Sequence, residues 1–202
     1  MKMEHNVISL GELNDEQVLE LARLHHVVMH SLLTDLGLPF LERYYQLAQK
    51  DASAIGFCVT YENGTPLGWV TGSPKPDQLN NRLREPLTWF ILQMLRLLFT
   101  RPWVLWQLAS SVFSSSGQSD MKDDAIELTY IGVSEKQKGT GVGTKLINRF
   151  ITASREAGYH SVILSVEVDN QPAVALYKKT GFEIIRTFLE GHYQRHRMEL
   201  KI

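Results

Sequence analysis

The chain of 202 residues is long enough for one domain with a sizeable core, and 44% hydrophobic with 21% charged residues is typical of a globular protein. Its formal net charge of −1 gives no basic excess of the kind that nucleic-acid binding requires. Cys58 is the only cysteine, so no intramolecular disulfide can form. Together with an N-terminus that lacks an apolar signal segment, this predicts a cytoplasmic protein.

The two parts of the chain differ in charge. Residues 1–80 carry five basic and ten acidic side chains, whereas residues 81–202 carry sixteen basic and twelve acidic ones. A basic C-terminal part would suit a phosphate-rich cofactor, and an acidic N-terminal part would attract a cationic amine. Ordinary surface solvation produces such imbalances too, so this observation leaves both interpretations open.

The N-terminal part predicts a strand followed by two helices. Residues 5–10 have the composition of a short strand. Asn14 or Asp15 can cap a helix whose apolar residues recur at helical spacing as far as Leu32. A second helix is predicted over residues 39–49, because proline is favoured in a first helical turn.

Two strands then form a predicted hairpin. The apolar segments at residues 55–61 and 67–72 flank the dipeptide Asn63-Gly64, which is typical of tight hairpin turns. Cys58 lies in the first of these segments, and we expect it to be a small buried hydrophobic residue.

The segment of residues 85–113 interrupts this pattern. It carries three of the four tryptophans and shows no period-two alternation, and Pro102 divides it. It therefore predicts a helical insertion with one helix at about 87–99 and a second at about 102–112. The polar stretch at 114–124 predicts a flexible loop.

Three roles are open for this insertion. It could pack on its own domain or in a dimer interface, cover an acceptor pocket, or lie on a membrane surface. Arg96 and Arg101 lie inside it, so no uncharged run of about 20 residues is available to span a membrane.

A strand, a glycine loop and a helix follow one another after the insertion. Residues 127–133 are rich in β-forming types, Gly139, Gly141 and Gly143 alternate in the loop, and helical spacing begins at Thr144. This order directs free backbone N–H groups and the positive end of a helix at one point, which makes a site for phosphate or pyrophosphate. The glycine spacing matches neither the nucleotide-hydrolase loop nor the dinucleotide fingerprint.

The C-terminal part returns to strands. Residues 161–168 alternate between apolar and polar positions and predict a strand with one apolar face. A helix is predicted after Asn170, and two closing strands are predicted at residues 182–190 and 196–202.

Two stretches carry a family resemblance. Residues 138–143 read K-G-T-G-V-G, and residues 170–182 read N-x-x-A-x-x-L-Y-x-x-x-G-F at the positions that matter. Together they resemble the two motifs of the GNAT superfamily of acetyl-CoA-dependent N-acetyltransferases, although Lys138 stands where Arg or Gln is usual. The resemblance implies an α/β fold with a mixed, mostly antiparallel central sheet and helices on both faces. It also implies a single acetyltransferase domain over residues 1–202, with the helical insertion between the third and fourth strands.

The resemblance further implies a site for acetyl-CoA as acyl donor. Backbone amides of the glycine loop would hold the pyrophosphate, and the preceding strand with the later helix would hold the pantetheine arm. The expected cofactor contacts are Ile131, Gly132, Val133, Lys138, Gly139, Thr140, Gly141, Val142, Gly143, Thr144, Asn170, Ala173 and Tyr177.

Two catalytic residues are implied as well. Tyr177 resembles the family's tyrosine that protonates the departing coenzyme A sulfur, and a phenol with a pKa near ~10 is protonated at neutral pH. Ordinary packing on the sheet is the alternative role. Glu127 lies where some members carry the base that deprotonates the amine, and on a regular strand it shares a face with Thr129 and Ile131. The alternatives are a solvent-facing strand end, with a water or another group as the base.

Taken together, these features predict transfer of an acetyl group from acetyl-CoA to a primary amine of a small molecule or peptide, by direct attack in a ternary complex. No metal is expected, because His26 and His30 lie four residues apart without the carboxylate of an H-E-x-x-H motif. No nucleic acid or transmembrane span is expected, and a homodimer would suit the insertion. The alternatives are a non-catalytic acyl-CoA-binding or regulatory module, and a membrane-surface or partner-docking protein that acts through residues 85–113.

Overall fold

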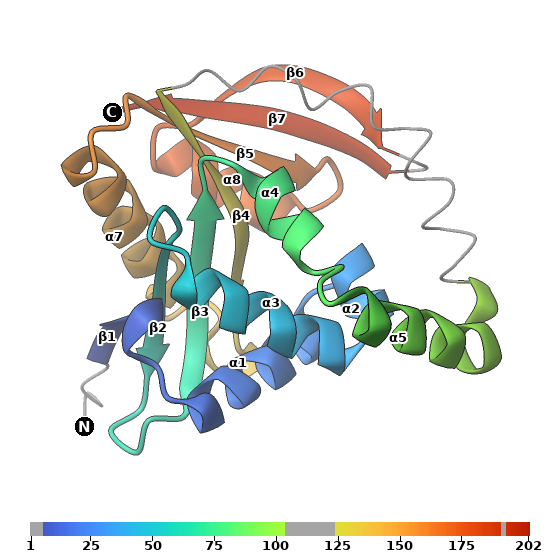
Figure 1. Ribbon diagram of the computed structural model, residues 1–202. Coiled ribbons are helices and arrows are strands. Elements are labelled where there is room, and N and C mark those ends of the chain that lie inside the picture. The colour runs from blue at the N-terminus through green and yellow to red at the C-terminus, as the bar shows by residue number, and fades with distance from the viewer. Residues whose placement is uncertain (1–5, 104–123, 191–192) are drawn as a thin grey trace.

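The computed structural model describes residues 6–103, 124–190 and 193–202 of the chain (Figure 1). Helices cover both faces of a central sheet. In chain order the helices and strands are β1 (Asn6–Ser9), α1 (Asp15–Val28), α2 (Leu32–Leu36), α3 (Leu38–Lys50), β2 (Ile55–Thr60), β3 (Pro66–Ser73), α4 (Pro76–Arg82), α5 (Leu87–Thr100), β4 (Ala125–Val133), α7 (Val142–Glu156), β5 (Ser161–Glu167), α8 (Gln171–Lys179), β6 (Glu183–Glu190) and β7 (Tyr193–Lys201).

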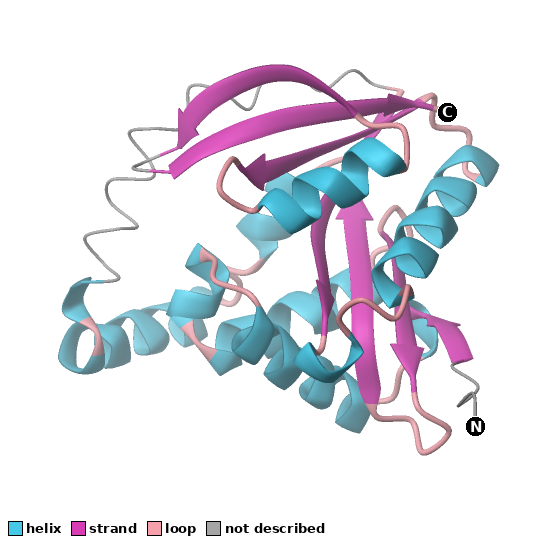
Figure 2. Cartoon of the chain, turned by 180° about the vertical axis from the view of Figure 1, so that it is seen from behind, coloured by secondary structure: helices cyan, strands magenta, loops and turns pink. Residues whose placement is uncertain are grey.

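The sheet has seven strands in the order β1-β2-β3-β4-β5-β7-β6. Every neighbouring pair is antiparallel except β4 and β5, which are parallel. Seen from either side, β5, β6 and β7 are turned away from the direction of β2, β3 and β4 (Figures 1 and 2). The predicted fold class, a mixed and mostly antiparallel sheet between helices, is confirmed.

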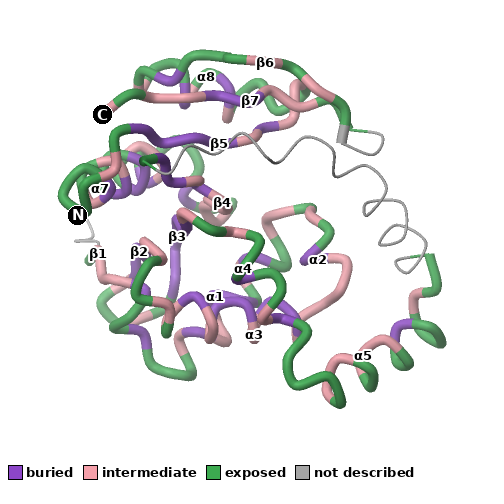
Figure 3. The backbone as a smooth tube through the Cα atoms, turned by 45° about the horizontal axis from the view of Figure 1, so that its top comes forward, coloured by how far each residue is buried: buried purple, intermediate pink, exposed green. Residues whose placement is uncertain are grey.

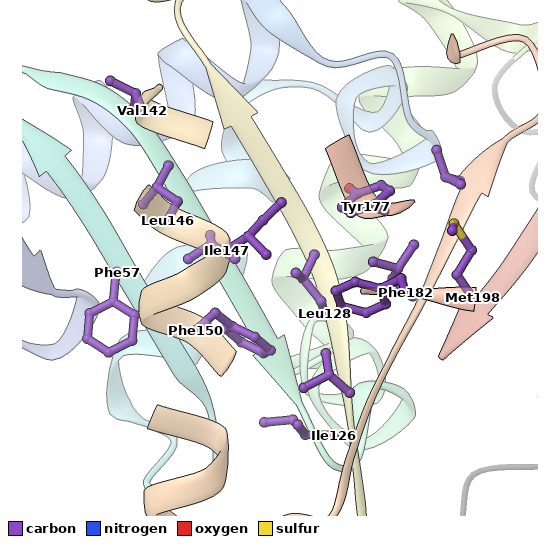
Figure 4. Close-up of a cluster of buried hydrophobic side chains, with 14 of the residues drawn as sticks. Phe57, Ile126, Leu128, Val142, Leu146, Ile147, Phe150, Tyr177, Phe182 and Met198 are labelled. Atoms are coloured by element: carbon purple, nitrogen blue, oxygen red, sulfur yellow. The ribbon is translucent and has the colours of Figure 1, made fainter. Parts of the chain in front are cut away.

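Each face of the sheet has its own hydrophobic core. The first core lies under α7 and α8 and includes Leu146, Phe150 and Tyr177 (Figure 4). The second lies under α1 and α3 and includes Tyr44 and Trp69. Figure 3 shows the buried positions concentrated along the central strands and the inner sides of these helices. Cys58, with no exposed surface, belongs to the second core as the sequence predicts, and burial raises the pKa of its thiol to about 12.

Local sequence signals account for the N-terminal elements. The Asn14 side chain accepts a hydrogen bond from the Gln17 N–H at 2.9 Å, and the Gln17 side chain accepts one from the Asn14 N–H at 3.0 Å. This reciprocal cap begins α1 where the sequence predicts. In the hairpin between β2 and β3, Gly64 has a φ of 84°, and the Thr65 N–H donates to Asn63 Oδ1 at 3.1 Å. The predicted tight turn is confirmed.

The insertion lies between β3 and β4, as predicted; α4 precedes it, and α5 is its first helix. Trp89 and Phe90 pack against Phe40 with ring centroids 5.0 and 6.2 Å away, and Leu97 is buried. The predicted helix at about 87–99 is therefore confirmed. Most of the second predicted helix, and all but the last residue of the 114–124 loop, lie outside the described residues. No helix among the described residues has the length and apolar content needed to cross a membrane.

One face of α5 is apolar and uncovered by the described parts of the chain. Leu92 is 66% exposed and Phe99 is 84% exposed, and Figure 3 shows α5 at the edge of the molecule. The large apolar residues exposed on α5 are Leu87, Ile91, Leu92, Leu95, Leu98 and Phe99.

A buried histidine joins the helices to the sheet. His25 has no exposed surface, and its Nδ1 lies 2.6 Å from the Tyr45 hydroxyl. Its ring stacks on Trp69 with centroids 5.2 Å apart and meets Tyr130 edge-on at 4.9 Å. Burial, together with the charge of nearby His26, lowers the pKa of His25 to about 3. His25 is therefore neutral in the folded protein at any moderate pH.

This burial predicts a loss of stability in mild acid. Between about pH 6.5 and about pH 3 the unfolded chain protonates His25 and the folded chain does not, so the free energy of unfolding falls as the pH falls. The contribution to the slope approaches about 1.4 kcal/mol per pH unit. Urea unfolding at pH 7, 6 and 5 should show a shallower pH dependence for His25→Gln than for the unmutated protein. His30→Gln, at an exposed position nearby, should keep the original slope. An unchanged slope in His25→Gln would contradict the assignment.

Candidate active site

The strands β4 and β5 pair over only part of their length. Their register runs from Ala125 opposite Ser161 to Leu128 opposite Leu164, although β4 continues to Val133. Beyond this point β5 pairs only with β7. Among the described residues, the later half of β4 thus has no strand partner on its β5 side. We call this place the strand divergence.

Backbone groups of β4 are directed into the strand divergence. The Ser134 N–H donates to the Leu67 carbonyl of β3 at 2.7 Å. Because hydrogen-bonding directions alternate along a strand, Gly132 is directed toward β3 like Ser134, and Ile131 and Val133 are directed toward β5. Unpaired N–H and C=O groups on a strand can bind an extended ligand arm in place of a neighbouring strand.

Gly132 has a packing role in the structure. A Cβ built at this position would lie within 2.5 Å of two atoms of the Trp69 ring. The indole therefore lies directly over the glycine, on the face covered by α1 and α3. Of the three β4 residues expected to contact a cofactor, Ile131 and Val133 direct main-chain groups at the site and Gly132 does not.

A β-bulge in β4 changes which side chains of this strand point to which face of the sheet. The register with β3 shifts by one residue and leaves Thr129 as the extra residue. On either side of this bulge, Leu128 and Ile131 both contact the core under α7 and α8, whereas Tyr130 contacts the other core. Glu127, one residue before Leu128, therefore lies on the same face as Tyr130. The expectation that Glu127 shares a face with Ile131 is wrong, because it assumed a regular strand. Thr129, whose hydroxyl lies beside Tyr44, stays on the Glu127 side.

The glycine loop follows β4 through a short 3₁₀ turn at Glu135–Gln137. Gly139 and Gly141 have φ values of 76° and 90°, a conformation that side chains disfavour. A Cβ at either glycine would meet nothing within 4 Å, so space lies open in front of the loop. Gly143 differs, because a Cβ there would lie 3.3 Å from Leu176 and would hold α7 farther from α8.

The loop presents unused backbone donors. The first N–H of α7 that bonds within the helix is that of Lys145, which donates to the Gly141 carbonyl at 3.0 Å. The N–H groups of Val142, Gly143 and Thr144 precede it and have no helical acceptor. Three adjacent donors at a helix N-terminus, behind two left-handed glycines, form an anion site. The order of strand, glycine loop and helix that the sequence predicts is thus present.

Side chains of the loop support its shape. The Thr140 hydroxyl donates to the Gln137 carbonyl at 2.7 Å, and buried Gln137 donates to the Tyr61 hydroxyl at 3.3 Å. Lys138 is exposed and forms an ion pair with Glu135 at 2.6 Å. Thr140 therefore braces the loop from inside, and Lys138 adds a positive charge at its edge.

The second motif forms α8 on the same face as α7. The Asn170 side chain accepts a hydrogen bond from the Ala173 N–H at 3.3 Å and caps the helix. Tyr177 is 6% exposed and meets Phe182 edge-on at 5.7 Å (Figure 4). Burial raises the pKa of the Tyr177 phenol above its usual value, so the hydroxyl keeps its proton at neutral pH.

Glu127 is held by an arginine that the sequence did not single out. The carboxylate oxygens of Glu127 accept hydrogen bonds from the two terminal nitrogens of Arg197 at 2.7 and 3.1 Å. The first of these nitrogens also donates to the Ser165 hydroxyl at 2.9 Å. The two residues of this ion pair lie far apart in the sequence. The one sequence signal for it is that Arg197 stands next to apolar Met198 in a predicted strand, where neighbouring side chains point to opposite faces.

Glu127 and Tyr177 lie on opposite faces of the sheet. Tyr177 belongs to the core under α7 and α8. Glu127 faces the other side, where Tyr44 of α3 lies close enough to sense its charge. Burial keeps the Tyr44 phenol neutral by raising its pKa, and the hydroxyls of Thr71 and Thr129 lie beside it. A reacting group in the strand divergence would therefore meet a carboxylate from one side and a phenol from the other.

Comparison with known proteins agrees with this geometry. The family model described as the acetyltransferase (GNAT) family matches residues 23–182. Mycothiol acetyltransferases from Saccharomonospora viridis and from Corynebacterium glutamicum strain R are each 41% identical, over 61 and 58 residues. These matches cover 30% and 29% of this chain, and the chain spans only 20% of the length of each relative.

Solved structures share the fold at low identity. The ribosomal-protein-S18-alanine N-acetyltransferase from Escherichia coli superposes with a TM-score of 0.60 at 14% identity, covering 98% of this chain and 94% of its own. A GCN5-related N-acetyltransferase from Kribbella flavida gives a TM-score of 0.60 at 14% identity, with 98% of each chain covered. At such identities the likeness shows the fold alone.

Proposed function

We propose that this chain, which belongs to the GNAT acetyltransferase family, transfers the acetyl group of acetyl-CoA to a primary amine. The observation that carries the proposal is the position of the glycine loop beside the strand divergence: the N-terminus of α7 lies at the end of a strand that, in the described part of the chain, has no neighbour on its β5 side. The acceptor is a small molecule or a peptide. The names of the matched proteins mention mycothiol and the alanine of a ribosomal protein, and thus do not single out one acceptor.

In the proposed complex, each part of the site contacts a different part of acetyl-CoA, the acyl donor. The N–H groups of Gly139 to Thr144 bind the pyrophosphate, with Lys138 adding charge at the edge. The main chain of Ile131 and Val133 pairs with the pantetheine arm, and Asn170 and Ala173 line the same arm from α8. The thioester carbon then lies in the strand divergence, between the two faces of the sheet.

The proposed chemistry is direct attack in a ternary complex. Glu127 takes a proton from the substrate ammonium, and the freed lone pair of the nitrogen attacks the thioester carbon. The carbon–sulfur bond breaks with its electron pair on sulfur, and the Tyr177 hydroxyl gives that sulfur a proton. The second proton lost from nitrogen restores the phenol through solvent. Cys58 takes no part, because its thiol is buried and protonated.

The phosphate loop can be tested by blocking it. Gly141→Glu should weaken acetyl-CoA binding at least about tenfold, because a carboxylate would occupy the anion site and repel the pyrophosphate. Calorimetric titration measures this directly. Gly158→Glu is the matched control, since Gly158 has a similar φ of 87° and similarly open surroundings but lies outside the loop. Equal binding by the two variants would contradict the assignment of the loop.

The role of Tyr177 can be tested by removing its hydroxyl. Tyr177→Phe should lower kcat by about 10²-fold or more, since general acids contribute on that scale, and should leave the Kd for acetyl-CoA nearly unchanged. Tyr159→Phe, at a partly buried tyrosine after α7, should keep full activity. Unchanged turnover in Tyr177→Phe would remove the phenol from the mechanism. If the unmutated protein bound acetyl-CoA and acetylated no amine, a non-catalytic acyl-CoA-binding module would be the better description.

The exposed face of α5 favours a second, compatible role as a contact between two copies of the chain. An apolar stripe of this kind on a helix can pack against its own symmetry mate across a two-fold axis. A variant with Leu92→Lys and Phe99→Lys should therefore be monomeric in sedimentation velocity, and the unmutated protein dimeric. Asn148→Lys with Thr152→Lys, on the exposed side of α7, should remain dimeric. A monomeric unmutated protein that sediments with lipid vesicles would instead favour the membrane-surface role.

A further inference from the structure

We infer that Arg197 is a positioning residue that supplies the counter-charge of the Glu127 carboxylate and holds it oriented at the strand divergence. The inference rests on the proposed function, because it concerns the group that would take the proton of the amine. Arg197 itself does not contact the reacting atoms. It acts through Glu127.

The contact between the two side chains is a two-point one. Both terminal nitrogens of Arg197 donate to separate carboxylate oxygens of Glu127, at 2.7 and 3.1 Å. Such a fork fixes the plane of the carboxylate as well as its distance, which a single-point lysine contact does not. The Ser165 hydroxyl accepts from Arg197 at 2.9 Å and fixes the guanidinium in turn.

The contact crosses a strand where the sheet divides. Arg197 stands on β7 opposite Ser165 of β5, and Glu127 stands on β4 opposite Ile163 of β5. The guanidinium therefore reaches over β5 to β4. Leu128 is the last residue of β4 that pairs with β5, and Glu127 directly precedes it. Ser165 is the first residue of β5 beyond that pairing. The ion pair thus fixes the two strands relative to each other at the point where they separate.

In the part of the chain that the structure describes, Arg197 is the cation in contact with the carboxylate. The side chains of Arg197 and Glu127 are only 9% and 14% exposed. From α3, neutral Tyr44 approaches Glu127, and Ser73 stands opposite it on β3. Along the same face of β5 and β7 lie Glu199 and the pair of Arg195 with Glu167, whose charged atoms are 3.6 Å apart.

Stability alone is a weak explanation for this ion pair. Two charges withdrawn from water lose much of their hydration, and a buried pair replaced by apolar side chains is often neutral for stability. A carboxylate in a two-point contact still has lone pairs for a proton from the amine or from an intervening water. Glu127 can therefore accept that proton while Arg197 remains in place.

The test follows Glu127 in two ways across pH. Its ionisation is measured by infrared difference spectroscopy, with Glu127→Gln identifying the band, and kcat/KM is measured with spermidine, glucosamine and a peptide beginning with alanine. Arg197→Met removes the counter-charge, so the pH at which the carboxylate band appears should rise. The acidic limb of kcat/KM should move with it.

Further variants separate charge from orientation. Arg197→Lys keeps the charge and should leave the acidic limb near its original pH while kcat falls. If Arg197→Met does not fold, the Arg197→Lys variant provides the test in its place. Arg195→Met, two residues along β7, should move neither measurement. Circular dichroism and the Kd for acetyl-CoA report whether each variant keeps its fold and its cofactor site.

Each outcome decides the question. Parallel movement of the Glu127 band and the acidic limb in Arg197→Met supports the inference. A band that moves while the limb stays would overturn it, leave the proposed function standing and make the ion pair a structural tie. If the unmutated protein binds acetyl-CoA but acetylates none of the three amines, the proposed function fails, and the inference is overturned together with it.

Discussion

The short parallel contact between β4 and β5 is the constraint on which the rest of the site depends. These strands are the one parallel pair in the sheet, and they pair only as far as Leu128 and Leu164. The bulge at Thr129 follows at once on β4. Backbone groups in a protein interior must be hydrogen-bonded, so a strand that loses its neighbour while still half-buried is a place for a ligand. Ile131 and Val133, both half-buried, present their main chain there.

The anion site depends on the same division of the sheet. Because β4 ends beside β3 through the Ser134 contact, the chain must turn sharply to begin α7. Gly139 and Gly141 supply the left-handed residues of that turn, and Gly143 lets α7 approach α8. The helix N-terminus consequently lies next to the end of β4, which lacks a neighbour on its β5 side among the described residues. A ligand that has a phosphate at one end and an extended amide-bearing arm at the other matches both features.

The sequence predicts local features well and nonlocal ones poorly. The Asn14 cap, the Asn63-Gly64 turn and the glycine loop are each written in a few neighbouring residues, and the structure confirms all three. The short helices α2 and α4 were not predicted, since five and seven residues show at most two turns of periodicity. The bulge at Thr129 depends on the register of β4 against β3, and the sequence of β4 alone does not carry that information.

The same distinction applies to the candidate site. The second motif indicated Tyr177 because its neighbours along α8 form a recognisable string. Glu127 was indicated from its place before the loop, but its face was wrongly assigned, and Arg197 was missed. The contact between Glu127 and Arg197 joins residues 70 positions apart, so only the strand order β4-β5-β7 reveals it.

The two proposed catalytic side chains are held by different means. Tyr177 is surrounded by the apolar core under α7 and α8, and burial keeps its proton in place by disfavouring the phenolate. A carboxylate in comparable burial would also favour its neutral form, which cannot accept a proton. The structure meets this difficulty on the other face of the sheet with a guanidinium in two-point contact. An acid held by apolar packing and a base held by a counter-charge can thus face one thioester from the two sides of a divided sheet.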